Sequence, residues 1–139
     1  MLRSSVLPSV VLRRTPGAAR GSYVFDVEYR GRTGMRCGLD VSAKSRATAV
    51  VWFDDRVREH SAVASAALQT LADFCFTDLT LQRIEVGALA GDATLPELLT
   101  ELGMHAESTA QPFPDPLGRL GDFSRWALAR SQWMRARPA

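Results

Sequence analysis

The chain has 139 residues, a hydrophobic share of 46% and a formal net charge of +2, so it is long enough to form one domain around its own core. A charge this close to neutral argues against a dedicated nucleic-acid binder, which carries a strongly basic face. The sequence has no apolar run near the roughly 20 residues that a membrane-spanning helix needs. We therefore expect neither nucleic acid nor a membrane as a partner.

The first 21 residues differ in composition from the rest of the chain. They contain four arginines and no acidic residue, and Pro8 interrupts their short apolar run. This composition is typical of a disordered or leader-like segment. We therefore divide the chain into an N-terminal segment, residues 1–21, without predicted structure and a folded domain, residues 22–139.

Three strands are predicted at the start of that domain. Residues 22–29 alternate between the two faces of a strand and are rich in β-branched and aromatic side chains. Residues 33–43 and 47–53 follow after short turns, the first of which contains Gly31. Strands joined so closely pair antiparallel, which predicts a three-stranded meander.

The hydrophobic period then changes to that of a helix. In residues 62–76 the apolar side chains recur three or four positions apart, which predicts a buried face that includes Ala64, Leu68, Leu71 and Cys75. Neither Cys75 nor Cys37 has a second cysteine or a histidine at metal-ligand spacing. Isolated cysteines of this kind fit a reducing cytoplasm.

The remaining elements continue the alternation of strands and helices. After a strand over residues 81–89, a second helix is expected to begin at Thr94, with Thr94 and Glu97 forming a capping box, and to end at Gly103. Two further strands, residues 104–109 and 122–129, flank a proline-rich loop over residues 111–118.

This order predicts an α/β fold, more narrowly α+β, with one mixed sheet. The segment 47–53 is followed by a helix and then by the strand 81–89. A strand–helix–strand crossover of this kind makes the two strands parallel. The expected architecture is a mixed antiparallel and parallel sheet with flanking helices.

Three segments of the chain carry a resemblance to a known family. They are DFCF followed by LTLQRIEV (73–76 and 79–86), GDATLPELLTELGM (91–104) and GDFSRWALARSQW (121–133). Together they resemble the C-terminal half of the GNAT-superfamily N-acetyltransferases, closest to the RimJ/RimL-like branch. The resemblance extends over residues 22–133 and implies a GNAT-like acyl-CoA N-acyltransferase fold.

The resemblance implies transfer of an acetyl group from acetyl-CoA to an amine of a small molecule or of a protein N-terminus. It places the pantetheine arm of acetyl-CoA on the backbone of Val51, Trp52 and Phe53, and the thioester end near Asp92. The N–H groups at the start of a helix bind anions. The pyrophosphate is accordingly expected on the turn into the first helix, formed by Glu59, His60, Ser61, Ala62, Val63 and Ala64.

That turn departs from the family pattern. Glu59 stands where the family has Gln or Arg, and Ala62 replaces a glycine that lets backbone approach the phosphates. An alternative is that the turn only starts a helix, with Ser61 as its N-cap. His60 is by residue type a possible general base, although a loop histidine is more often solvated than catalytic.

The catalytic residues are less clear than the cofactor site. Glu85 is the candidate base that the resemblance offers, with Glu107 as a second, although the position of Glu85 also fits a structural role. Leu95 replaces a serine of the RimL-like members. A second function therefore stays open, namely a catalytically inactive GNAT-fold remnant that serves as a binding or assembly module.

The resemblance also implies that an N-terminal part is missing. Family members begin with a strand and two helices that wall one side of the acceptor groove, whereas only 21 residues precede Ser22. Without that wall, apolar side chains on one sheet face should lie open, and such patches mark contact sites. We therefore expect a homo-oligomer or a partner chain.

Overall fold

The computed structural model describes residues 1–42, 45–111 and 115–136, without the side chains of residues 57, 58, 108–111 and 136. The strands are β1 (Leu2–Arg3), β2 (Val10–Arg14), β3 (Ser22–Tyr29), β4 (Arg32–Val41), β5 (Thr48–Phe53), β6 (Arg83–Leu89), β7 (His105–Gln111) and β8 (Phe123–Ala129). The helices are α1 (Ser61–Asp73), α2 (Thr94–Leu102) and α3 (Arg130–Ala136), with short helical segments η1 (Asp55–Glu59) and η2 (Phe74–Asp78).

The eight strands form one mixed sheet in the order β1-β2-β3-β4-β5-β6-β8-β7. The neighbours β3, β4 and β5 pair antiparallel, which confirms the predicted meander. β5 and β6 pair in parallel, which confirms the predicted crossover. β8 lies between β6 and β7 and is antiparallel to both. The predicted α/β class with a mixed sheet is therefore confirmed.

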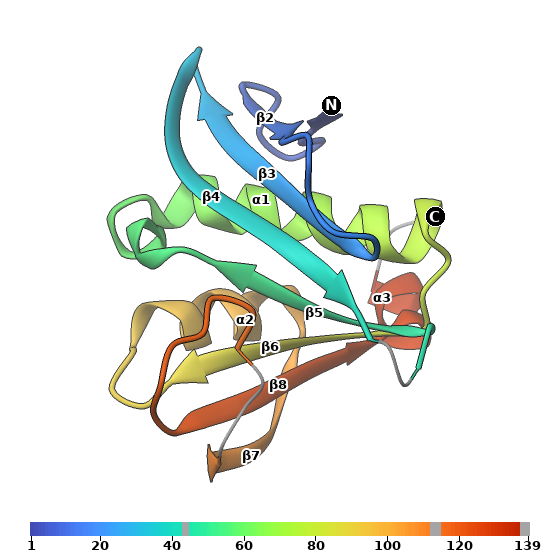
Figure 1. Cartoon of the computed structure of the whole chain (residues 1–139), viewed down its shortest axis with the longest axis vertical. Coiled ribbons are helices and arrows are strands. Elements are labelled where there is room, and N and C mark those ends of the chain that lie inside the picture. Colours follow the sequence, from blue (N-terminus) through green and yellow to red (C-terminus); the bar gives the residue numbers. More distant parts are fainter. Residues whose placement is uncertain (43–44, 112–114, 137–139) are drawn as a thin grey trace.

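Helices α1 and α2 cover one face of this sheet and lie behind the strands in Figure 1. The predicted helical face is confirmed, because Ala64, Leu68 and Leu71 of α1 and Cys75 of η2 are all buried. These side chains join Phe25, Leu39 and Ile84 of the sheet in one hydrophobic core. Residue 43 of the predicted second strand and residues 112–114 of the predicted loop lie outside the described residues.

The N-terminal segment differs from the expectation of a disordered start. β2 pairs antiparallel with β3, from Val10↔Tyr29 to Arg14↔Phe25. Val10 and Leu12 are fully buried in the core on the α1 side of the sheet. The arginine-rich composition of this segment therefore did not indicate that it contains a strand, β2, whose apolar side chains complete the core. Residues 15–21 pass from β2 to β3 without a helix.

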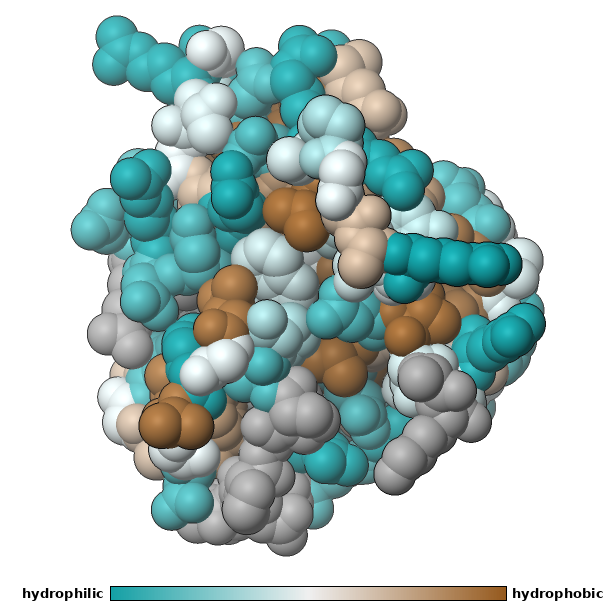
Figure 2. All heavy atoms as spheres, in the orientation of Figure 1, coloured by the Kyte–Doolittle hydropathy of each residue, from teal (hydrophilic) through white to brown (hydrophobic). Residues whose placement is uncertain are grey.

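The sheet face away from α1 and α2 is mixed: Trp52 is buried on it, and Val24 and Val50 are half-buried among charged side chains. None of the large hydrophobic residues that are exposed in the described part of the chain lies on this face, so the expected open apolar face is not found. It carries ion pairs between Arg36 and Asp26 and between Arg13 and Glu28. In Figure 2 hydrophobic residues form separate groups among hydrophilic ones. Charged residues such as Asp26 and Arg36 alternate on this face with the half-buried Val24 and Val50, so the face is polar only in part. The large exposed apolar residues are instead found near the termini and in a loop: Met1, Val6, Leu117, Leu120 and Met134.

Within the described ranges, no helix combines the length and the apolar character needed to cross a membrane.

Candidate functional site

β5 and β6 separate toward their C-terminal ends. Their last paired residues are Val51 and Val86. Beyond this pair Trp52 and Phe53 pair with β4, whereas residues 87–89 pair with β8. The divergence of the two strands is visible in Figure 1. Because backbone N–H and C=O groups require partners, two strand edges that face each other unpaired can bind an extended ligand.

The end of β5 is held against β4 by a close contact at Gly38. A Cβ atom at this position would lie 2.7 Å from the Trp52 ring and 2.3 Å from the backbone oxygen of Tyr23. Trp52 therefore lies directly over the glycine and is buried. This contact positions the strand edge on which the pantetheine arm was predicted.

The turn from β5 to α1 is tied to β4 through Asp54. The carboxylate of Asp54 accepts hydrogen bonds from the backbone N–H of Arg36 (2.9 Å) and of Arg56 (3.1 Å). The Arg56 guanidinium donates to the backbone oxygen of Gly34 at 3.3 Å. These bonds place the start of α1 beside the opening between β5 and β6.

The start of α1 has no side-chain cap. Its N-cap residue is His60, and its first turn contains no acidic residue. The predicted Ser61 cap is wrong, because Ser61 is already helical and an N-cap residue needs a non-helical backbone. The free N–H groups and the positive end of the helix dipole therefore favour an anion here.

The other residues of the predicted phosphate turn directly precede and follow the N-cap residue His60. Glu59, His60, Ser61 and Ala62 are exposed, Val63 is half-buried and Ala64 is buried. The structure thus brings the predicted turn and the predicted strand end together.

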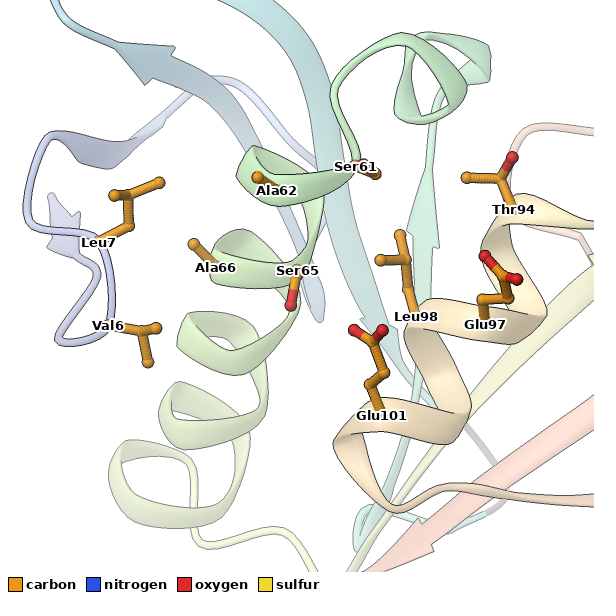
Figure 3. Close-up of a pocket in the computed structure, with 10 residues that line it drawn as sticks. All are labelled: Val6, Leu7, Ser61, Ala62, Ser65, Ala66, Thr94, Glu97, Leu98 and Glu101. Atoms are coloured by element: carbon orange, nitrogen blue, oxygen red, sulfur yellow. The ribbon is translucent and has the colours of Figure 1, made fainter.

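A groove of about 390 Å³ lies between α1 and α2 (Figure 3). Ala66 and Leu98 provide buried apolar surface. Ser65 and Glu101 lie on its facing sides, and the loop before β2 approaches α1 from the other direction. Glu97 and Glu101 are exposed on α2, so carboxylates stand opposite the helix start that would bind an anion. The remaining lining residues are Val6, Leu7, Ser61, Ala62 and Thr94.

Asp92, expected near the thioester, is used to start α2. Its carboxylate accepts hydrogen bonds from the backbone N–H of Thr94 (3.0 Å) and of Leu95 (3.2 Å). The predicted capping box of Thr94 and Glu97 is wrong, because the N-cap residue is Ala93 and has no side-chain cap. A carboxylate two residues before the helix satisfies the same N–H groups in place of the Thr94 hydroxyl.

This difference can be measured. Asp92→Ala should lower the free energy of unfolding by about 1 kcal/mol, because two N–H groups of α2 lose their acceptor. Thr94→Ala is the matched variant. It should lower the free energy of unfolding by at most about 0.3 kcal/mol, because the Thr94 hydroxyl does not cap the helix. Urea unfolding of the two variants compares them, and a larger loss from Thr94→Ala would contradict the assignment of the cap.

Glu85 does not lie in the groove. Its neighbours Ile84 and Val86 are buried, so Glu85 faces the opposite side of the sheet. There its carboxylate accepts hydrogen bonds from Arg83 at 2.9 and 3.1 Å, and Arg125 lies 3.9 Å away. Arg83 also binds Glu107, the second candidate base. Both candidates belong to one ion-pair cluster.

Two charged residues beside the opening were missed by the sequence analysis. The carboxylate of Asp115 accepts hydrogen bonds from the backbone N–H and from the Nε of Arg119, at 2.8 and 2.7 Å. Arg119 reaches Asp55 of η1 at 3.4 Å, so the loop before β8 is connected to the turn after β5. The pair lies in a loop and not on a helix, so its spacing of four residues was not a signal in the sequence.

The pKa values of the pair reflect this contact. Burial acts to raise the pKa of the Asp115 carboxyl, but the hydrogen bonds and charge of Arg119 outweigh it and the pKa lies below its usual value. The hydrogen bond from Arg119 to Asp115 raises the pKa of the Arg119 guanidinium. Both groups are therefore charged at neutral pH.

No protein-family model and no curated protein matches the chain. Solved structures do. A probable acetyltransferase matches with a TM-score of 0.67 and 19% identity, covering 82% of this chain and 65% of that one. RimJ of Mycobacterium smegmatis, in complex with CoA-disulfide, matches with a TM-score of 0.66 and 22% identity over 80% of this chain and 54% of its own.

A third similar structure is the spermidine/spermine N-acetyltransferase SpeG of Vibrio cholerae. It matches with a TM-score of 0.67 and 18% identity over 85% of this chain and 71% of its own. The chain therefore has the fold of the GNAT acetyltransferases, as the three sequence segments indicated. It spans about two thirds of the probable acetyltransferase and about half of RimJ.

Proposed function

We propose that the chain is a GNAT-type N-acetyltransferase that binds acetyl-CoA between β5 and β6 and transfers its acetyl group to an amine. The observation that carries this proposal is the opening beyond Val51 and Val86 next to the uncapped start of α1. One structurally similar protein is a RimJ in complex with CoA-disulfide, and another is named a spermidine/spermine N-acetyltransferase.

The residues present fit acetyl-CoA in part. The unpaired edge at Trp52 and Phe53 suits the pantetheine arm, and the first N–H groups of α1 suit the pyrophosphate. Three exposed carboxylates oppose it, those of Glu59, Glu97 and Glu101. Like charges at an interface weaken binding, although solvent and salt screen part of the effect. The proposed site therefore binds acetyl-CoA with low affinity.

The proposed reaction requires little from side chains. When bound, acetyl-CoA supplies an acetyl group activated as a thioester. The acceptor nitrogen forms a bond to the acetyl carbon while the carbon–sulfur bond breaks, the nitrogen loses one proton and the thiolate gains one. Because Glu85 is held by Arg83 on the opposite sheet face, a water relay is the proposed route for the amine proton.

A second candidate function is an inactive remnant that acts as a binding or assembly module. This alternative is favoured because two residues expected in the acetyl-CoA site have structural contacts outside it. Asp92 caps α2, and Glu85 is ion-paired with Arg83. Under this alternative the fold persists while its acyl-donor site has lost affinity.

The turn into α1 provides the test. The double variant Glu59→Arg with Ala62→Gly should bind acetyl-CoA at least about tenfold more tightly than the natural chain, or roughly 1.4 kcal/mol. It removes a like charge and a Cβ atom where the pyrophosphate would approach. Isothermal calorimetry measures the affinities of both proteins.

Asp78→Arg serves as the control, because it makes the same charge change at an exposed residue beyond the far end of α1. It should leave the affinity within about twofold of the natural chain, since solvent screens distant charges. Tight binding by the natural chain would show that Glu59 and Ala62 do not weaken the site. Absence of binding by every protein would favour the inactive module.

The proposal includes three further expectations. The acceptor is an amine of a small molecule or of a protein N-terminus. The chain associates with a second copy or a partner chain, a proposal that does not rest on an open apolar sheet face. It acts in the cytoplasm, which the two buried free thiols of Cys37 and Cys75 support.

A further inference from the structure

A second cavity lies between the β3–β4 hairpin and the start of α1. Its volume is about 160 Å³, and it shares no lining residue with the groove between α1 and α2. Val27 and Met35 from the two strands are buried in its apolar wall, and Val63 closes it from α1. The other lining residues are Tyr29, Arg32, Gly34 and His60.

The cavity depends on a β-bulge in β4. Val27 pairs with Met35 and Glu28 pairs with Thr33, so Gly34 is an additional residue opposite this step. The His60 ring lies against Gly34, because a Cβ atom there would be 3.7 Å from Nε2. Bulges bend a strand and redirect its side chains. Here the bulge makes room for an imidazole beside the apolar wall.

The size of this cavity selects a small ligand. A dry apolar cavity of about 150 Å³ holds one benzene molecule, so a volume of about 160 Å³ suits a ring or a short branched hydrocarbon. Binding sites of this kind combine apolar walls with a few polar groups that fix orientation.

The side chains at the solvent-exposed side of this cavity favour an anionic ligand. Arg32 and His60 are the exposed lining residues, and the Tyr29 hydroxyl adds a further hydrogen-bond donor by residue type. The lining contains no carboxylate. A guanidinium group matches the two oxygens of a carboxylate in geometry and charge. Glu59, next to His60 in the chain, is exposed and is not part of the lining.

We propose that this cavity binds a small apolar carboxylic acid in its anionic form. The hydrocarbon part lies among Val27, Met35 and Val63, and the carboxylate lies at Arg32 and His60. The site does not depend on acetyl transfer or on acetyl-CoA, so it is tested without either.

Benzoate and benzamide are the matched probes, because they have nearly the same shape and only benzoate is charged. Titration of the full chain, followed by two-dimensional amide NMR, should show saturable benzoate-dependent shifts of Val27, Gly34 and Met35, which line the cavity and lie outside the turn into α1. Benzamide should bind at least about tenfold more weakly, since it lacks the charge that pairs with the guanidinium. Equal affinities for the two probes, or shifts confined to the groove between α1 and α2, would overturn the proposal.

Two variants locate the ligand within the cavity. Arg32→Gln should reduce benzoate affinity to that of benzamide and leave benzamide binding unchanged. Val63→Phe should abolish binding of both, because the larger ring fills the cavity. Glu97→Gln, in the other groove, should change neither affinity. Unchanged benzoate binding in Arg32→Gln would refute the assignment of the carboxylate, and unchanged binding in a folded Val63→Phe protein would refute the cavity itself.

Discussion

Replacing Leu12 with alanine is expected to lower the free energy of unfolding by about 3 kcal/mol. Leu12 is fully buried and lies opposite Val27 in the pairing of β2 with β3. Its removal leaves a cavity between the sheet and the helices, and the surrounding core relaxes only in part. Urea unfolding monitored by circular dichroism measures the loss.

Val6→Ala provides the control within the same segment. The Val6 side chain is 60% exposed, so its truncation should change stability by no more than about 0.5 kcal/mol. Equal and small effects of the two substitutions would mean that β2 does not belong to the folded domain. The pair therefore tests whether residues 1–14 are part of the fold, against the disorder that their composition suggested.

Replacing Gly38 with alanine should cost about 2–3 kcal/mol of stability and lower the melting temperature by about 8 °C. The added Cβ would lie 2.3 Å from the backbone oxygen of Tyr23 and 2.7 Å from the Trp52 ring. A backbone oxygen cannot move away without disturbing the pairing of β3 with β4. Differential scanning calorimetry gives the change in melting temperature.

Gly34→Ala is the matched control in the same strand. Its Cβ would meet only the His60 ring, at 3.7 Å, which is an ordinary contact distance. Its effect should stay within about 0.5 kcal/mol. A loss in Gly38→Ala no larger than that in Gly34→Ala would show that Gly38 is not in close contact with Tyr23 and Trp52. The larger loss should be accompanied by weaker acetyl-CoA binding, since Trp52 borders the proposed site.

Periodicity was sufficient to predict most of the elements. The change from a two-residue period in residues 22–29 to a helical period in residues 62–76 reflects which side chains each element must bury, and that information is local. Gly103 ends α2 with a φ of 100°, as expected for the left-handed position after a helix. The parallel pair of β5 and β6 followed from the crossover alone.

Capping and charge pairing were predicted less well. Thr94 and Asp92 can both supply oxygen to the start of α2, and the sequence does not state which one the local backbone brings within reach. Glu85 was linked to catalysis by resemblance, yet the sheet face on which it lies depends on the register of β6 with its neighbours. A shift of one residue would place its side chain on the other face.

The sequence by itself determined the order of strands and helices, the buried face of α1 and the position of the altered turn at Glu59 and Ala62, because these depend on neighbours along the chain. Only the tertiary structure decided that Leu12 completes the core and that the Gly34 bulge opens a cavity beside His60. It also decided that Arg119 connects its loop to η1. Each of these contacts joins residues distant in sequence, and packing and strand register select it from many that the composition allows.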